Sequence, residues 1–339
     1  DVSVSTNLGP WVNQRGVFSL DVRNDVFRDE KVASAQKWLR HGGGQHMELG
    51  IAENNLFIML AALGLSGPVF GTRLLPVGTL YDPFIARGLD ALNYACYQDA
   101  RFMLVATPAG ITLAPEGGAH QSISTPLIGM GQPGLISFEP TYADELAVIM
   151  KWGFEYMQED EGGSIYLRLS TRTINQPQRT ITPQLEKDIL GGAYWMIEPN
   201  KDSPLAIIYT GTVVPEVLDA FNDLKEDIPG LGLLSITSSD RLYHDWQRSL
   251  TINENREQPH LERLFSRLNR KAALITVQDG HPANLSWIGA TTGRRVYPLG
   301  LTEFGQSGNL PDLFRTYKID ADAIIQMAAR ASIDLASPR

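Results

Sequence analysis

One acidic side chain stands where it could exchange a proton. Glu53 follows a glycine-rich loop (Gly42 to Gly44) and opens an apolar stretch of helical period, so its carboxylate lies in the first turn of a predicted helix. The dipole of a helix favours a carboxylate in that turn, which is the simplest reason for finding one there. A catalytic role for Glu53 therefore depends on which other groups surround it.

Two aromatic side chains follow about thirty residues later. Tyr81 and Phe84 are three residues apart and flank Asp82-Pro83, a typical helix opening because proline is tolerated in the first turn. In a helix, this spacing places both rings on one face. Taken alone, the pair is better explained as two core aromatics.

A second glycine-rich loop carries a histidine. His120 follows a predicted strand and stands between Glu116 and Gln121. A neutral imidazole on such a loop could donate a proton to a substrate oxygen or remove one from it. A solvent-facing or structural histidine is the alternative when the loop is considered alone.

These residues require an α/β framework to position them. Apolar runs of strand length alternate with segments of helical period, which predicts a mostly parallel sheet covered by helices. The expected strands are residues 2–5, 69–71, 101–107, 135–139 and 164–169, and the expected helices are residues 53–65, 82–98 and 142–157. Thr141 and Asp144 are expected to cap the last of these helices.

A second α/β unit is expected after a segment rich in proline, glycine and charge. We predict a first domain at residues 1–182, a linker at 183–202 and a second domain at 203–339. The second domain has expected strands at 205–210, 232–236, 273–278 and 296–299, and expected helices at 214–225, 261–268 and 319–329. The predicted fold class is therefore two three-layer α/β domains.

Composition excludes several classes of partner. The net charge is −9 and the 29 basic residues are scattered, so neither nucleic acid nor an anionic membrane is expected as a partner. No apolar stretch approaches the roughly 20 residues that cross a bilayer. The single cysteine, Cys96, cannot form an internal disulfide, and no secretory signal precedes Asp1, so a cytoplasmic location is expected.

The ordered set of segments resembles the thiamine-diphosphate-dependent transketolase superfamily. Gly50-Ile51-Ala52-Glu53 is similar to the family's glycine-hydrophobic-x-glutamate element, and residues 78–87 are similar to its aminopyrimidine-stacking segment. Residues 107–121 resemble the transketolase loop that ends in glycine-x-x-His-Gln. The Tyr-x-x-Phe pattern is closer to bacterial pyruvate dehydrogenase E1 than to transketolase.

The resemblance implies a role for each candidate residue. Glu53 would contact N1′ of the thiamine aminopyrimidine and, as a buried acid, promote the imino tautomer whose nitrogen removes the thiazolium C2 proton. Tyr81 and Phe84 would stack on the aminopyrimidine ring. The substrate would be contacted by Glu116, His120 and Gln121.

The substrate implied is a small 2-oxoacid, with pyruvate favoured and lipoamide as the acyl acceptor. Residues 300–307 and 317–320 look like the C-terminal domain of homodimeric bacterial pyruvate dehydrogenase E1. Pro108 replaces a sugar-binding histidine of transketolase, and Arg172 is one residue out of step with its phosphate-binding arginine. The alternatives are a transketolase or related ketol transferase, and a non-catalytic dimerisation or assembly module.

The resemblance also implies a partner. The family's Gly-Asp-Gly…Asn segment, which binds diphosphate and Mg²⁺, does not occur here, and Gln278-Asp279-Gly280-His281 is interpreted as a strand-end turn. A domain or subunit outside this chain would hold Mg²⁺, within a homodimer or a heterotetramer, and an E2 acyltransferase is a further expected partner. The family's first helix, which precedes the strand at residues 2–5, is expected to be missing, leaving that flank exposed or covered by another subunit.

Overall fold

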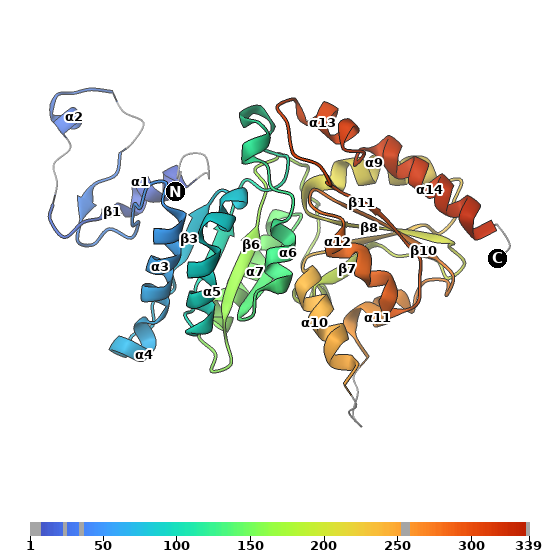
Figure 1. Cartoon of the computed structure of the whole chain (residues 1–339), viewed down its shortest axis with the longest axis horizontal. Coiled ribbons are helices and arrows are strands. Elements are labelled where there is room, and N and C mark those ends of the chain that lie inside the picture. Colours follow the sequence, from blue (N-terminus) through green and yellow to red (C-terminus); the bar gives the residue numbers. More distant parts are fainter. Residues whose placement is uncertain (1–7, 23–25, 34–36, 252–257, 337–339) are drawn as a thin grey trace.

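The computed structural model describes residues 8–22, 26–33, 37–251 and 258–336. Two α/β domains lie side by side, and the first part of the chain extends beyond the outer edge of the first domain (Figure 1). This extension contains two short helices, α1 (Gly9–Arg15) and α2 (Val26–Asp29), and two parallel strands, β1 (Val17–Phe18) and β2 (Arg40–His41). The strand expected at residues 2–5, and with it the flank expected to lack a helix, lies outside the described residues.

The first domain is built on a four-stranded parallel sheet with the order β3-β4-β6-β5. Its strands are β3 (Val77–Leu80), β4 (Met103–Ala106), β5 (Leu135–Phe138) and β6 (Ser164–Arg168). Alternate side chains of β4 enter two different cores, because Leu104 packs on one face of the sheet and Met103 on the other. Both faces are therefore buried, as in a parallel sheet covered by helices.

Helices cover both faces of this sheet. The core around Phe57, Leu92 and Tyr166 is shared with α3 (Glu53–Gly64), α5 (Leu89–Tyr97) and α6 (Thr125–Gly131). The opposite core, around Phe138 and Ile149, is shared with α7 (Ala143–Tyr156) and α8 (Pro183–Gly191).

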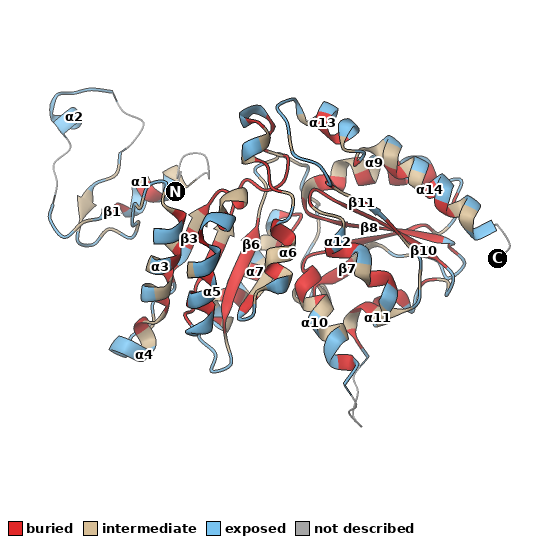
Figure 2. Ribbon diagram, viewed as in Figure 1, coloured by how far each residue is buried: buried red, intermediate tan, exposed pale blue. Residues whose placement is uncertain are grey.

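The second domain has a five-stranded sheet with the order β11-β10-β8-β9-β7. Its strands are β7 (Ala193–Ile197), β8 (Leu205–Thr210), β9 (Gly232–Ile236), β10 (Ala273–Gln278) and β11 (Val296–Leu299). One face carries α9 (Val214–Leu224), α13 (Leu310–Thr316) and α14 (Ala321–Ala336), and the other carries α10 (Ser239–Ser249), α11 (His260–Phe265) and α12 (Ala283–Ser286). Figure 2 shows buried strands between helices whose outer faces are exposed. The predicted α/β fold class is confirmed.

The segment predicted as a linker, residues 183–202, is largely regular structure. It contains α8 and β7, and β7 is the antiparallel edge strand of the second sheet. Ala193 packs in the core of the second domain, whereas Tyr194 packs in that of the first. The five residues of β7 form an apolar run of strand length, but this run lies between Gly191-Gly192 and Pro199-Asn200, whose turn-forming residues led to the interpretation as a linker.

Three local predictions are also corrected. The strand expected at residues 69–71 is instead the end of a short helix, α4 (Ser66–Phe70), which Gly71 terminates with a left-handed φ of 73°. The helix expected at residues 82–98 begins with a 3-10 turn, η1 (Asp82–Gly88), before α5. Helix α7 is capped by Glu145, whose carboxylate accepts the backbone N–H of Thr141 at 2.7 Å, and not by Thr141 itself.

Candidate active site

The structure brings together three of the rings singled out in the sequence. Tyr81 immediately follows β3, and Phe84 lies in η1; their ring centroids are 6.1 Å apart and the planes differ by 20°. The imidazole of His120 approaches both rings edge-on, with centroids 5.4 Å from Phe84 and 6.4 Å from Tyr81. Residues from two distant loops therefore form one aromatic cluster, comprising Tyr81, Phe84 and His120, above the carboxyl ends of β3 and β4.

Glu53 is connected to this cluster through an arginine that the sequence analysis missed. Glu53 begins α3 and is 5% exposed, and its Oε1 accepts a hydrogen bond of 3.1 Å from Arg87 Nη1. The guanidinium carbon of Arg87 lies 4.0 Å from the centre of the Phe84 ring, a cation–π contact. Because the Arg87 side chain is 54% exposed, this ion pair orients Glu53 more than it stabilises the fold.

The three residues expected to contact substrate lie in different environments. His120 ends a short 3-10 turn, η3 (Gly118–His120), and its Nδ1 is buried without a hydrogen-bond partner among the described residues. Glu116 is exposed at the end of the preceding turn, η2 (Ala114–Glu116). Gln121 is 6% exposed, and its Nε2 donates to the backbone oxygen of Gln306 at 2.9 Å. The Gln121 side chain is thus directed to the second domain.

The loop that carries His120 is anchored by a carboxylate of the second domain. Asp279 follows β10, and its two oxygens accept the backbone N–H of Ile111 at 2.9 and 3.0 Å. Gly110 has a φ of 66°, and a Cβ there would overlap the Asp279 carboxylate. The expected strand-end turn at Gln278-Asp279-Gly280-His281 therefore binds the loop of the first domain that carries His120.

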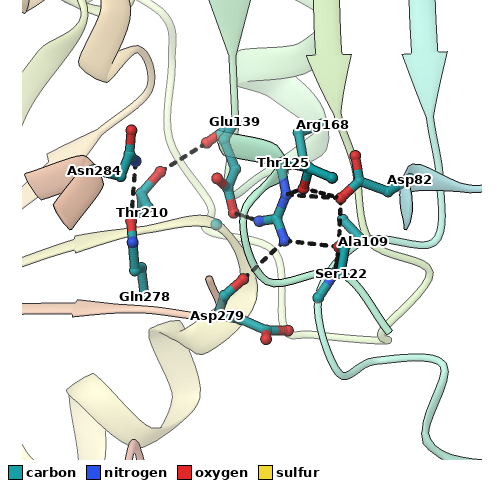
Figure 3. A network of polar contacts seen from close by, with 12 residues as sticks. Asp82, Ala109, Ser122, Thr125, Glu139, Arg168, Thr210, Gln278, Asp279 and Asn284 are labelled. Atoms are coloured by element: carbon teal, nitrogen blue, oxygen red, sulfur yellow. Dashed lines mark hydrogen bonds and ion pairs between the residues drawn. The ribbon is translucent and has the colours of Figure 1, made fainter. Parts of the chain in front are cut away.

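A buried arginine, Arg168, lies at the centre of a polar network that includes Asp82, Ser122 and Asp279 (Figure 3). Arg168, at the end of β6, donates to Asp82 at 3.0 Å, to Glu139 at 2.6 Å and to the backbone oxygen of Asp279 at 2.9 Å. It also donates to Ser122 Oγ at 3.2 Å. Since Asp82 adjoins Tyr81 and Ser122 follows Gln121, one guanidinium fixes both segments that form the cluster.

Two carboxylates, those of Asp82 and Glu139, form ion pairs with this guanidinium, and the Asp279 carboxyl group interacts with it electrostatically. Loss of solvation raises the pKa of Glu139 to about 7, even though Arg168 opposes the shift. The same cause raises the pKa of Asp279 to about 6. The negative charge of Asp82 adds to both upward pKa shifts, so Glu139 and Asp279 are the groups of this network most easily protonated by acid.

Arg172 is also committed to an interdomain contact. Its guanidinium donates to both carboxylate oxygens of Glu216, at 2.8 and 2.6 Å, and to the backbone oxygen of Thr212 at 2.8 Å. The same group lies 4.8 Å from the Phe314 ring centre. A bidentate ion pair of this kind occupies the planar donor surface that a phosphate would need.

The sequence profile of the pyruvate dehydrogenase E1 component middle domain matches residues 24–177, the part of the chain that contains Glu53, the aromatic cluster and Arg168. The chain is similar to the thiamine-diphosphate-dependent transketolase-like superfamily. Its relatives include proteins named pyruvate dehydrogenase E1 component and probable transketolase. The superfamily implies thiamine diphosphate as the cofactor.

Two relatives illustrate this range. The pyruvate dehydrogenase E1 component of Pseudomonas aeruginosa is 26% identical over 304 residues, which cover 86% of this chain and 34% of that protein. A protein named probable transketolase from Schizosaccharomyces pombe is 24% identical over 294 residues, covering 85% of this chain and 37% of that protein. The chain thus spans about a third of the length of these relatives.

Solved transketolase structures share the fold of this chain. The transketolase from Leishmania mexicana superposes with a TM-score of 0.73 at 16% identity, covering 99% of this chain and 42% of that one. A split-gene transketolase, described as an inactive beta4 tetramer, gives a TM-score of 0.61 at 19% identity, covering 97% of this chain and 95% of that one. At these identities the likeness concerns the fold alone.

Proposed function

We propose that this chain supplies the aminopyrimidine half of a thiamine diphosphate site in an E1-type enzyme. That enzyme decarboxylates a small 2-oxoacid, with pyruvate favoured, and passes the acyl unit to lipoamide. The observation that carries the proposal is the connection from buried Glu53 through Arg87 to the aromatic cluster of Tyr81, Phe84 and His120.

These residues suit the chemistry of an aminopyrimidine. The buried Glu53 carboxyl would hold a proton against a ring nitrogen, while Tyr81 and Phe84 would contact the flat ring and exclude water. The buried, unpartnered Nδ1 of His120 would exchange a proton with a substrate oxygen. When bound, thiamine diphosphate supplies the nucleophilic carbon and the electron sink.

Two features favour a 2-oxoacid over a sugar phosphate. Pro108 has no donor with which to bind a sugar hydroxyl, and Arg172 is already paired with Glu216. The transketolase alternative is supported by the relative from Schizosaccharomyces pombe and by the split-gene structure. A non-catalytic assembly module is disfavoured because it has no need of a buried carboxylate that is connected through Arg87 to the aromatic cluster.

A partner would complete the site. We propose that the diphosphate and Mg²⁺ are held by a domain or subunit outside this chain, in a homodimer or heterotetramer in the cytoplasm, with an E2 acyltransferase as a further partner. The split-gene transketolase, described as a beta4 tetramer, is an example of the separate-subunit form in a chain of this fold.

The test is turnover by the complex with the polypeptide that carries the Gly-Asp-Gly…Asn segment. Release of CO₂ from pyruvate and consumption of a ketose phosphate should be measured side by side for wild type, Glu53→Gln and Glu48→Gln. Glu48 is the matched control because its carboxylate is exposed and paired with exposed Arg40. We expect CO₂ release that only Glu53→Gln abolishes; consumption of the ketose phosphate alone would establish the transketolase alternative.

A further inference from the structure

We infer that a segment of the second domain, residues 304–308, positions His120, and that Gln121 is the positioning residue through which it acts. The inference rests on the proposed function only for the role of His120 in turnover. The resemblance places Gln121 at the substrate, whereas its observed contacts are with the 304–308 segment. A residue that contacts the substrate and a residue that positions His120 differ, because the positioning residue acts without touching the substrate.

The backbones of the two loops are in direct contact. A Cβ on Gly118 would overlap the backbone oxygen of Gly305, and a Cβ on Gly305 would overlap Oε1 of Gln121. A Cβ on Gly117, which has a φ of 93°, would lie 2.8 Å from Ser307 Oγ. Glycine is therefore required on both sides of the contact, since any larger residue would separate the loops.

Hydrogen bonds fix the register of this contact. The Gln121 Nε2 donates to the Gln306 backbone oxygen at 2.9 Å, and the Gly308 N–H donates to Ala114 oxygen at 3.4 Å. The segment is itself held from behind, because the hydroxyl of Tyr317 donates to the backbone oxygen of Phe304 at 2.7 Å.

His120 lies between the two points that are held. Gly118, at the start of η3, contacts Gly305, and Gln121, directly after η3, is bonded to Gln306. Within the turn, the N–H of His120 donates to Gly117 oxygen at 3.1 Å and that of Gln121 to Gly118 oxygen at 3.3 Å. The imidazole can therefore stay against Phe84 only while both ends of this turn are fixed.

Two measurements on the chain test the inference without cofactor or turnover. One is amide hydrogen exchange of His120 and Gln121, whose N–H groups are bonded within the turn. The other is the ¹³C-ε1 NMR signal of His120 in protein labelled at histidine, of which the chain has six. The variants are Gln121→Ala, Gly305→Ala and the double substitution. The control is Phe304→Ala, because the Phe304 side chain is 92% exposed.

We expect Gln121→Ala to lower protection of both amides about two- to tenfold, the effect of losing one neutral hydrogen bond, and to displace the His120 signal. Gly305→Ala should do the same, and its effect should be smaller in the Gln121→Ala background, because the overlap of the new methyl group with Gln121 Oε1 is then gone and only its close contact with the Cβ of residue 121, at 2.8 Å, remains. Phe304→Ala should change neither measurement.

An unchanged His120 signal in folded Gln121→Ala protein would overturn the inference, even if the protein were less stable. Gln121 would then stabilise the fold without positioning His120. Equal effects of Gly305→Ala in both backgrounds would overturn it as well. If Gly305→Ala alone does not fold, Gln121→Ala still decides. Failure of the proposed function would appear only in turnover, so the two outcomes are distinguishable.

Discussion

The guanidinium of Arg87 donates a hydrogen bond of 3.1 Å to the carboxylate of Glu53. The same guanidinium covers the Phe84 ring, so a single side chain sets both the orientation of the carboxylate and one wall of the aromatic cluster. Because Arg87 is half-exposed, its ion pair orients the Glu53 carboxylate and contributes little to the stability of the fold.

Arg87→Ala should lower kcat of the assembled enzyme about fivefold, the effect of about 1 kcal/mol of lost orientation at Glu53. Thermal unfolding should be nearly unchanged. Steady-state kinetics with pyruvate and a melting curve check both statements. Arg40→Ala, which removes an exposed ion pair with Glu48, is the control and should leave kcat at the wild-type value.

Glu53→Gln should reduce kcat at least about 100-fold while leaving the fold intact, because glutamine keeps the shape of the side chain but cannot supply the acidic proton. Exchange of the thiazolium C2 proton for deuterium, followed by NMR in the assembled enzyme, should slow in parallel. Near wild-type exchange in this variant would show that Glu53 does not act on the aminopyrimidine.

His120→Ala should cost less than Glu53→Gln and should act on a different step. His120 is placed to serve the substrate oxygen, so kcat should fall while exchange at C2 continues at the wild-type rate. The same two measurements separate the roles. Equal losses of C2 exchange in both variants would mean that His120 belongs to cofactor activation.

The chain alone should bind thiamine diphosphate with Mg²⁺ weakly. It offers ring contacts, whereas the described residues contain no cluster of three histidine, cysteine or carboxylate side chains that could hold a metal ion. Calorimetric titration of the isolated chain should therefore give little heat, and titration of the complex with its partner should give a stoichiometric curve. Tight binding by the chain alone would reveal a diphosphate site within it.

Much of the framework follows from the sequence because its strands are buried on both faces. Strands β8 and β10 were predicted to the residue, since all six residues in each are buried and form unbroken runs. Strand β7 was missed although its five residues form an apolar run, because the glycines before it and Pro199-Asn200 after it are typical of a linker. Its first two residues are buried in different cores, a role between two domains that no local pattern encodes.

The sequence likewise predicted only part of the candidate site. Glu53, Tyr81, Phe84 and His120 were singled out from local motifs. The groups that hold the site in place were not, because Arg87 is 34 residues from Glu53, Asp279 is 168 from Ile111, and Gln306 is 185 from Gln121. Contacts at such separations are determined by how helices, loops and domains pack, which no local spacing encodes. Asp82, interpreted as a helix opening, is also a partner of Arg168.

Protonation of the Arg168 network should make stability depend on pH in a specific direction. Burial raises the pKa of Glu139 from 4.5 to about 7, so between these values the folded protein binds more protons than the unfolded chain. The contribution of Glu139 to the free energy of unfolding is therefore largest below this window and declines as the pH rises through it.

Glu139→Gln should consequently flatten the pH dependence of the melting temperature across this window, because glutamine does not titrate yet can still accept a hydrogen bond from Arg168. Relative to wild type, the variant should gain stability as the pH rises from about 4.5 to about 7. Glu155→Gln, on the exposed face of α7, is the control and should leave the profile unchanged. A Glu139→Gln profile parallel to that of wild type would mean that Glu139 keeps its charge throughout, and that Arg168 outweighs its desolvation.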